Sequence, residues 1–466
     1  MTDTALLSAT ETRRRIGAGE LTAVRSVEAA LDRVVTLNES INAVVTLSVT
    51  ALEEARALDE RLAAGEAPGL LHGLTVGIKD VTPVAGLRTT FGSPLYADHV
   101  PAEDALVVRR LREAGAVILG KTNAPEFATG GNTFNEVFGV TRNPWDPTRS
   151  AGGSTGGGAA GLATGMIALA EGTDLGGSLR IPASFCGVVG LRPSAGLVPT
   201  YPSDFLWDSY QVTGPMARTA EDVALMLQAV AGPSALSPMR QPTRGRDFIG
   251  AVRAGPKEGL RVAYCADITG IGIDREVSAT CSAAIEALAS AGVEVEEVEL
   301  DLSGARKPFL ALRGLWMIAQ QHSRLEHLEA FGANLAGNVR AGLETSTVEI
   351  AAAESVRAGL WSTFHDLFQD FDHLLTPCMA VAPFPADQNY PQTVGGQEME
   401  TYIDWVAPTF VLSMTGLPVA SVPAGLDPSG LPVGLQIVGR PEGEEEVLAL
   451  AEQIQQLRPI GVPQAR

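Results

Sequence analysis

The chain has 466 residues, of which 45% are hydrophobic and 19% charged, a balance that is ordinary for a globular protein with a sizeable core. Its 54 acidic residues outnumber 34 basic residues and give a formal net charge of −20, which opposes binding to the phosphate backbone of a nucleic acid. No run of about 18 consecutive apolar residues occurs, so we predict no membrane-spanning helix.

The cysteines and the N-terminal residues favour a reducing compartment. The first 20 residues hold no apolar stretch long enough for a secretion signal. No Cys-x-x-Cys pair occurs, so neither a disulfide framework nor a zinc ribbon is indicated, and we expect a cytoplasmic protein without a metal site. The four cysteines are scattered, at Cys186, Cys265, Cys281 and Cys378.

The first half of the chain alternates between helical and strand patterns. Residues 1–65 are predicted to be mainly helical, beginning with a capping box formed by Ser8 and Glu11. Residues 74–79 are typical of a short strand that ends at a lysine. An amphipathic helix is predicted over 102–114, followed by a buried strand over 116–119.

The rest of the chain repeats this alternation and indicates the fold class. A helix rich in small residues is predicted over 156–168, and residues 233–258 are expected to form a surface connection. Residues 261–300 fit a strand, a helix and a strand, which favours an α/β fold with a mostly parallel sheet and helices on both faces. Residues 303–370 are predicted to be mainly helical, and no composition break separates a second domain within 1–466.

Residues 150–193 carry the densest chemical pattern in the chain. Two serines, Ser154 and Ser178, lie 24 residues apart, each surrounded by glycines. Such glycines permit unusual backbone dihedrals and a close backbone approach. These are the conditions under which several backbone N–H groups can point at a developing negative charge.

The motifs around both serines resemble those of the amidase signature family. The chain has GGSTGG at 152–157 and GTDLGGSLRIPA at 172–183, and further matching segments lie at 72–80, 111–123 and 214–218. The resemblance covers roughly residues 65–235, the expected signature core, with a short match near GLPVASVP at 416–423. It implies one large domain with a central, mostly parallel, twisted mixed sheet covered by helices on both faces.

The resemblance also implies a reaction and a catalytic set. Ser178 occupies the position of the nucleophile, Ser154 that of the proton relay and Lys79 that of the base. The implied reaction is hydrolysis of the carboxamide bond of a small molecule through an acyl-enzyme, without a cofactor or metal. A scaffold that had lost activity is expected to show a broken set, and here the set is complete.

The proposed base makes a demand on its surroundings. A solvated lysine has a pKa of about 10.4 and is charged at neutral pH, but burial lowers that pKa. Leu74, Val76 and Ile78 suit a buried strand, and alternation along the strand turns Asp80 away from Lys79. From the residues alone, a strand-end lysine in a surface salt bridge fits as well.

The oxyanion hole is expected at the turn that contains the nucleophile. The predicted donors are the backbone N–H groups of Leu175, Gly176, Gly177 and Ser178. Leu175 replaces the threonine that is usual in the family, which removes a hydroxyl but leaves the backbone donor. A plain tight turn that ends at Ser178 is the alternative.

Three segments match the consensus patterns of other protein classes in residue type and spacing. Residues 115–122 fit a phosphate-binding loop and 156–161 a dinucleotide-binding loop, but neither has the required strand, turn and helix in order. Residues 152–156 fit the G-x-S-x-G motif of α/β-hydrolases, which would make Ser154 the nucleophile of an esterase with a downstream histidine such as His373. No strand is predicted before Ser154, which argues against that alternative.

The substrate is predicted only in outline. The runner-up within the family is the glutaminase subunit of an aminoacyl-tRNA amidotransferase, but its acidic residue ten positions before Gly-Leu-Pro is replaced here by Val406, with Asp404 nearby. An apolar or aromatic acyl pocket is therefore favoured, and a homodimer is expected. The candidate lining residues of the acyl pocket are Phe127, Thr129, Gly130, Gly131, Trp207 and Trp405.

Overall fold

The computed structural model describes residues 3–463 and is organised around one sheet of eleven strands. Residues 1–2 and 464–466 of the predicted domain lie outside the described part. The strand order is β1-β3-β2-β6-β8-β7-β14-β15-β11-β9-β10. Their bounds are β1 Val44–Leu47, β2 Thr75–Lys79, β3 Val117–Thr122, β6 Leu169–Asp174, β7 Val189–Arg192, β8 Val212–Ala217, β9 Arg261–Tyr264, β10 Glu294–Glu297, β11 His373–Pro377, β14 Val419–Leu426 and β15 Pro432–Val438.

The sheet is mixed, as expected, but the expectation that most of its strand pairs are parallel is wrong. Among the described strands, six neighbouring pairs are antiparallel and four are parallel. Parallel pairing joins β3, β2 and β6 on one side and β11, β9 and β10 on the other. The expectation extended the pattern of 261–300 to the whole sheet, whereas the centre contains the hairpin β14–β15 and other antiparallel neighbours.

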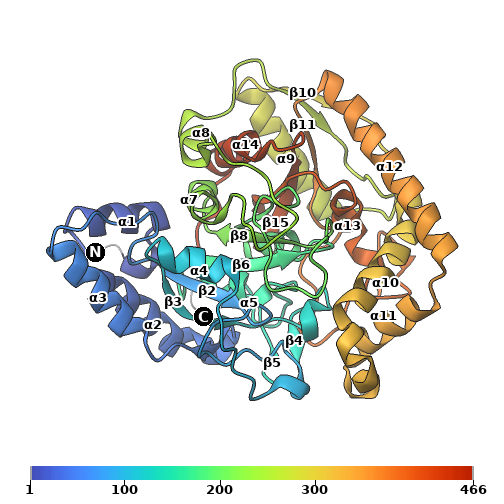
Figure 1. Ribbon diagram of the computed structural model, residues 1–466. Helices are drawn as coiled ribbons and strands as arrows, with labels where there is room; N and C mark the ends of the chain where they lie inside the picture. The colour runs from blue at the N-terminus through green and yellow to red at the C-terminus, as the bar shows by residue number, and fades with distance from the viewer. Residues whose placement is uncertain (1–2, 464–466) are drawn as a thin grey trace.

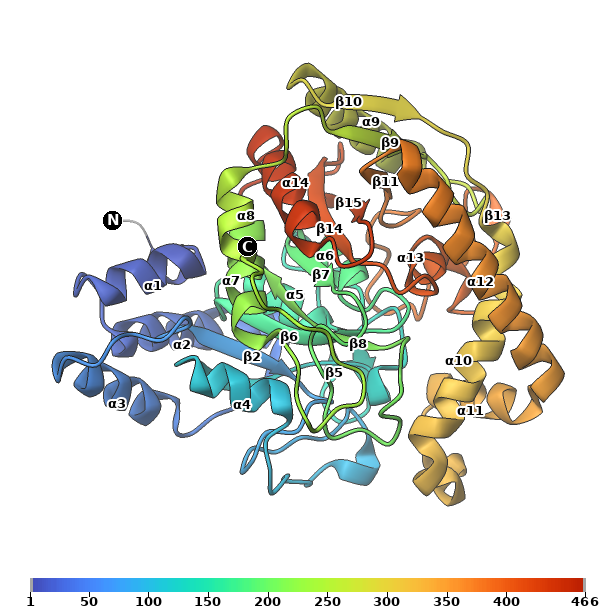
Figure 2. The same cartoon turned by 45° about the horizontal axis from the view of Figure 1, so that its top comes forward.

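Helices cover both faces of the sheet, as expected for an α/β protein (Figures 1 and 2). The apolar cluster on one face contains residues of α1, α4, α7, α8, α9 and α14, and the clusters on the other face contain residues of α2, α3, α5, α6, α10, α11, α12 and α13. The helices are α1 Ala9–Gly17, α2 Ala23–Ile41, α3 Ala51–Ala63, α4 Leu106–Glu113, α5 Gly156–Ala163, α6 Arg180–Cys186, α7 Ala220–Val230, α8 Phe248–Ala254, α9 Arg275–Ser290, α10 Arg306–Gln321, α11 Ala333–Glu344, α12 Thr347–Asp370, α13 Ala407–Ser413 and α14 Glu444–Leu457.

Local sequence signals set several helix starts. Ser8 caps α1 by accepting a hydrogen bond from the backbone N of Glu11 at 3.1 Å, whereas the Glu11 carboxylate turns to Arg14 and Arg15 instead of completing the box. Two expectations about helices need correction. The helix predicted over 102–114 begins at Leu106, and the connection predicted over 233–258 contains α8, which Asp247 caps.

The helices α10, α11 and α12 lie together on the side of the molecule opposite α1–α3 (Figure 1). They occupy the predicted helical segment 303–370 and contribute to an apolar cluster with α6 and α13. Within residues 3–463, none of the helices is long and apolar enough to cross a bilayer. All four cysteines are free and buried.

Candidate active site

Lys79 ends β2 and points toward the face of the sheet that carries α5. Its neighbours Val76 and Ile78 pack into the apolar cluster of the opposite face, as strand alternation requires. Lys79 is completely buried. Its Nζ lies 2.7 Å from Oγ of Ser154 and 3.0 Å from Oγ1 of Thr173, both within hydrogen-bonding distance.

Burial controls the protonation of Lys79. Desolvation lowers the pKa of Lys79 to about 7, against the opposing effect of the negative charges of Glu171 and Asp174. The Glu171 carboxylate accepts hydrogen bonds from Thr82 Oγ1 at 3.0 Å and from the backbone N of Lys79 at 3.2 Å, and burial raises its own pKa. The Asp80 carboxylate turns away from Lys79 and accepts hydrogen bonds from Thr90. The amine beside Ser154 therefore has a pKa close to neutral pH.

Ser154 lies in the glycine-rich loop that leads into α5 and is fully buried. The peptide bond between Gly153 and Ser154 is cis. Gly152 has a φ of +73°, and a Cβ there would lie 2.9 Å from the backbone of Pro182, so only glycine fits. Thr133 fastens the loop by donating to the carbonyl oxygen of Gly152 at 2.8 Å and accepting from the N–H of Gly156 at 3.1 Å.

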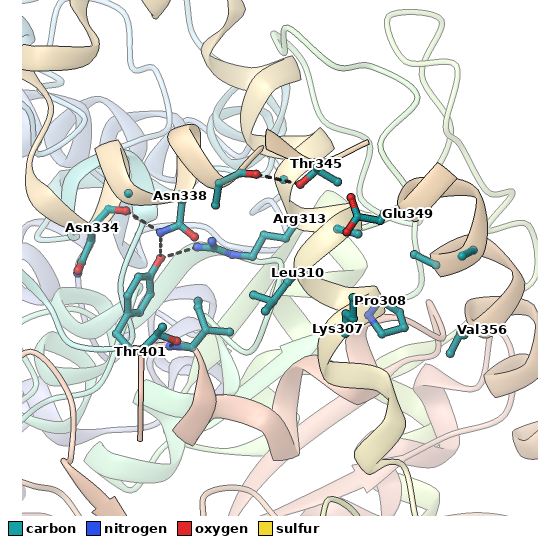
Figure 3. A pocket seen from close by; sticks show the side chains of 18 of the residues that line it. Lys307, Pro308, Leu310, Arg313, Asn334, Asn338, Thr345, Glu349, Val356 and Thr401 are labelled. Carbon is teal, nitrogen blue, oxygen red and sulfur yellow. Dashed lines mark hydrogen bonds between the residues drawn. The ribbon is translucent and has the colours of Figure 1, made fainter. Parts of the chain in front are cut away.

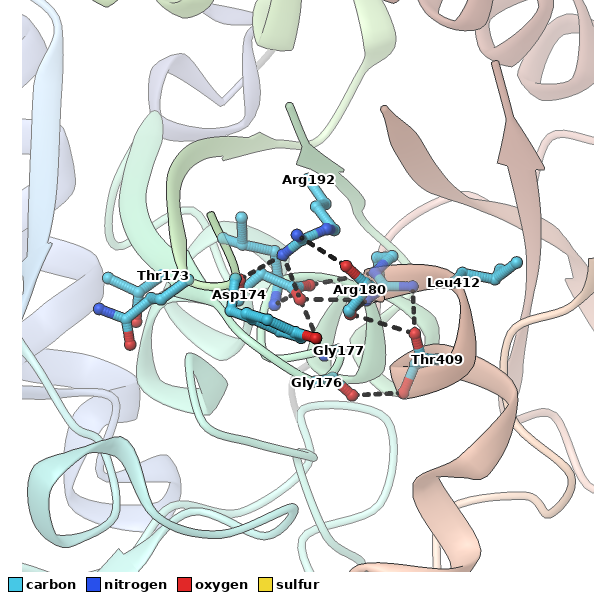
Figure 4. A network of polar contacts seen from close by, with 12 residues as sticks. Thr173, Asp174, Gly176, Gly177, Arg180, Arg192, Thr409 and Leu412 are labelled. Carbon is cyan, nitrogen blue, oxygen red and sulfur yellow. Dashed lines mark hydrogen bonds and ion pairs between the residues drawn. The ribbon is translucent and has the colours of Figure 1, made fainter. Parts of the chain in front are cut away.

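Ser178 lies on the turn between β6 and α6, which a buried network holds in place (Figure 4). The Asp174 carboxylate accepts hydrogen bonds from the backbone N of Gly177 at 2.8 Å and of Leu179 at 3.1 Å. Arg180 binds the same carboxylate at 3.0 and 3.1 Å. Burial alone would raise the pKa of Asp174, but Arg180 and Arg192 lower it well below its usual range, so Asp174 stays an anion.

The oxyanion donors predicted from the sequence are only partly available. The Gly177 N–H is occupied by Asp174 and is not free for a substrate, which corrects that prediction. The signal was present in the sequence, because an aspartate three residues before a glycine commonly accepts its N–H in a turn. In the described chain, the N–H groups of Leu175, Gly176 and Ser178 donate to no protein acceptor.

Ser178 lines a cavity of about 50 Å³. Two of the predicted pocket residues, Gly130 and Gly131, line this cavity, together with residues of α10 and of the segment before α13 that were not among the predicted pocket residues. Those residues come from segments without a recognisable motif. The only feature of the sequence that could have indicated a role in the site was an arginine, Arg313, within an apolar helical segment. The apolar part of the lining consists of Ala128, Leu175, Ile181, Phe309, Trp316, Met317, Ile403 and Val406.

The other predicted pocket residues lie outside this cavity. Phe127 lines a neighbouring cavity of about 230 Å³, and the buried Thr129 donates to its carbonyl oxygen. Trp405 is buried against Phe185 and Phe384, behind the cavity wall. Trp207 is 71% exposed.

The arrangement around Ser154 opposes the α/β-hydrolase alternative. No strand ends directly before Ser154, since residues 151–153 form a loop, and Lys79 rather than a histidine contacts its hydroxyl. His373 is buried in β11, where desolvation lowers its pKa to about 4. The letters of a phosphate loop at 115–122 fall mostly within β3, and no group of three metal-ligating side chains gathers anywhere in residues 3–463.

The chain is similar to known proteins over nearly its whole length. The sequence model of the Amidase family matches residues 25–448. An acylamidase from Rhodococcus erythropolis is 36% identical over 461 residues, 97% of this chain and 96% of the relative. One of the subunits of the glutamyl-tRNA(Gln) amidotransferase of Carboxydothermus hydrogenoformans is also 36% identical, over 97% of both chains.

Among solved structures, the crystal structure of a bacterial aryl acylamidase of the amidase signature family superimposes with a TM-score of 0.90 at 27% identity. The match covers 97% of this chain and 96% of the aryl acylamidase. Sequence and fold thus agree with these relatives along nearly the whole length of the protein. The chain belongs to the amidase signature family, whose members hydrolyse amides.

Proposed function

We propose that this enzyme hydrolyses the carboxamide bond of a small-molecule substrate through an acyl-enzyme on Ser178, with Ser154 as relay and Lys79 as base. The observation that carries the proposal is the contact of 2.7 Å between Nζ of Lys79 and Oγ of Ser154, deep in the protein. A lysine whose pKa lies at about 7 is largely neutral above that pH and can accept a proton. Ser178 lines the cavity where an amide would bind.

The reaction then follows in balanced steps. Ser178 passes its proton to Ser154, Ser154 passes its own to Lys79, and the Ser178 oxygen attacks the amide carbon. The N–H groups of Leu175, Gly176 and Ser178 stabilise the oxyanion. The C–N bond breaks as the relay returns the proton to the leaving nitrogen. Water then gives a proton to Lys79 through Ser154 and attacks the ester carbon. The bond to the Ser178 oxygen breaks as the relay returns the proton to that oxygen, which releases the carboxylic acid and restores Ser178.

The glutaminase activity suggested by the amidotransferase relative is the second candidate. A glutamine bound here needs an acidic partner for its α-ammonium group, because an unpaired buried charge is costly. Val406 lines the cavity at the expected position. Asp404 instead pairs with Arg306 at 2.6 Å and accepts the N–H of Thr401 at 2.7 Å, so its carboxylate is already engaged. The cavity therefore favours an amide without an ammonium group.

A labelling experiment tests the nucleophile. The enzyme is treated with a fluorophosphonate, and the modified peptide is mapped by mass spectrometry in wild type, Ser178→Ala and Ser154→Ala. We expect one added group on Ser178, no label in Ser178→Ala and loss of labelling in Ser154→Ala, which retains Ser178 but lacks the relay. A label on Ser154 in the wild type would contradict the assignment. Parallel assays compare aryl and aliphatic amides with glutamine.

A further inference from the structure

Arg313 is a buried cation without an anionic partner. It lies on α10 and is 7% exposed. Its Nη2 donates a hydrogen bond of 2.6 Å to the hydroxyl of Tyr402, and its guanidinium lies 5.6 Å from the centre of the Tyr402 ring. Within residues 3–463, no acidic side chain forms an ion pair with it. Because buried charges are normally paired, this arginine has capacity left for a ligand.

Other buried arginines of the same protein are paired. Arg180 is completely buried and binds the Asp174 carboxylate with two nitrogens. Arg192 is also completely buried and lies 3.5 Å from an oxygen of the same Asp174 carboxylate. The fold thus supplies anions to these interior guanidinium groups, and Arg313 departs from that pattern.

Arg313 faces the proposed reaction centre. It lines the cavity that contains Ser178, and it also lines a larger cavity of about 610 Å³ among α10, α11 and α12 (Figure 3). The acidic residue that lines the larger cavity, Glu349, is engaged as the cap of α12, where it accepts from the backbone N and the hydroxyl of Ser346. An anion that reaches Arg313 therefore has to come from a ligand.

Tyr402 supplies a second donor at the same place. Its hydroxyl oxygen accepts hydrogen bonds from Arg313 at 2.6 Å and from Nδ2 of Asn338 at 2.7 Å. Asn338 uses its other Nδ2 proton on the carbonyl oxygen of Asn334 at 2.6 Å. Since both neighbours of Tyr402 act as donors, the phenolic proton must point to another acceptor. Tyr402 also lines the cavity of Ser178, so that acceptor can belong to a substrate.

We propose that Arg313, assisted by Tyr402, binds a carboxylate carried by the amide substrate, which makes the enzyme selective for amides with a remote carboxylate. This inference rests on the proposed amide hydrolysis and names its substrate class. The planar guanidinium suits a carboxylate, with which it forms two parallel hydrogen bonds. The apolar side chains of Phe309 and Met317 line the same cavity and suit the hydrocarbon part between the amide and the acid.

Matched substrate pairs test the selectivity. Glutaranilic acid and valeranilide place a carboxylate or a methyl group on the acyl side, whereas 4-acetamidobenzoate and 4-methylacetanilide place them on the amine side. We expect the wild type to prefer the acid by at least about tenfold in kcat/KM within one pair, and that pair identifies the side that Arg313 binds. A ratio near one in both pairs, with the anilides hydrolysed, would overturn the proposal.

Variants separate binding from structural support. Arg313→Met is expected to lower the acid-to-neutral ratio of kcat/KM by about 10- to 100-fold. Tyr402→Phe keeps the cation and should lower the ratio by only about threefold. Arg313→Lys retains a positive charge without the planar guanidinium, so its decrease in the acid-to-neutral ratio should lie between those of Arg313→Met and Tyr402→Phe. This variant also provides the test if Arg313→Met does not fold. Equal effects of Arg313→Met and Tyr402→Phe would show that Arg313 merely supports Tyr402, and would contradict the proposal.

A binding measurement does not depend on turnover. Melting temperatures are compared in sodium glutarate and in sodium chloride of equal ionic strength, for wild type, Ser178→Ala and Arg313→Met. Glutarate is expected to raise the melting temperature of the first two proteins more than that of Arg313→Met. Equal shifts in all three would overturn the carboxylate site. If glutarate raised the melting temperature only when Arg313 is present, but the wild type hydrolysed no amide, the carboxylate site would be supported and the proposed function refuted.

Discussion

At the scale of single residues, one buried amine carries the acid–base chemistry of the proposed mechanism. Most hydrolases with a serine nucleophile use an imidazole, whose pKa lies near neutrality in water. In this protein burial brings Lys79 into the same range, with a pKa of about 7. The strand that places Lys79 under α5 is therefore part of the chemistry, because a solvent-exposed lysine would remain charged.

The pH dependence of activity should follow this amine. Since the neutral form is the base, kcat/KM is expected to rise about tenfold per pH unit below pH 7 and to level off above it. Lys79→Arg provides the matched control, because arginine is always protonated and should reduce kcat/KM by about 10²- to 10⁴-fold at every pH. A wild-type rate that declines between pH 6 and 8, with an unchanged circular dichroism spectrum, would contradict a neutral lysine base.

At the scale of elements, the turn between β6 and α6 is held by parts of the chain far away in sequence. Gly177 has a φ of +123°, which favours glycine, and a Cβ there would lie 2.3 Å from Oγ1 of Thr409 in α13. The same Oγ1 lies 2.6 Å from the carbonyl oxygen of Gly176. The turn and α13 are thus fitted to each other, and the position of Ser178 depends on both.

Two adjacent glycines give a matched test of this fit. Gly177→Ala is expected to lower the free energy of unfolding by about 1–3 kcal/mol and to reduce turnover, because the turn must move away from Thr409. At Gly176 the nearest atom to an added Cβ is the ring of Phe309 at 3.3 Å, which a small shift relieves, so Gly176→Ala should cost less than about 1 kcal/mol. Equal losses in urea denaturation would contradict the argument.

The sequence predicts those parts of the site that are local in the chain. The strand that ends at Lys79 and the loop that precedes α5 follow from neighbouring residues, and the structure has them at β2 and α5. The contribution of α10 depends on long-range packing, in which Phe309 stacks on Phe410 of α13 with ring centres 4.2 Å apart. No local pattern encodes that contact, so the sequence did not identify Arg313 as a cavity residue.

In the sheet, too, pairings that are local in the chain could be predicted from the sequence, whereas long-range pairings could not. The parallel pair β9–β10 was predicted from a strand, a helix and a strand in succession, and the structure confirms it. The antiparallel centre joins β7 to β14, which lie more than 200 residues apart, and such pairing leaves no local signature.

At the scale of the whole molecule, stability should depend on a histidine remote from the reaction. His373 lies in β11, between β15 and β9 of the sheet, and burial lowers its pKa from 6.5 to about 4. Between these values the unfolded chain binds a proton that the folded chain does not, so the free energy of unfolding falls as the pH falls from 6.5 to 4. One group with such a shift accounts for about 3 kcal/mol.

Replacing His373 by leucine should remove this part of the acid sensitivity. The free energy of unfolding, measured in urea from pH 7.5 to 4.5, is expected to decline less steeply in His373→Leu than in wild type. Above pH 7 the two curves should run parallel, since the histidine is neutral in both states there. Parallel curves over the entire range would show that His373 does not control acid unfolding.

The order of synthesis along the chain determines when the network around Ser178 can form. Arg180 reaches across the core to Thr409 and Gln436, with hydrogen bonds of 2.9 and 2.8 Å. During synthesis these partners leave the ribosome more than 200 residues after the serine itself. The turn that carries Ser178, the proposed nucleophile, therefore completes its hydrogen bonds only after α13 and β15 have been synthesised, and we expect hydrolytic activity to appear only then.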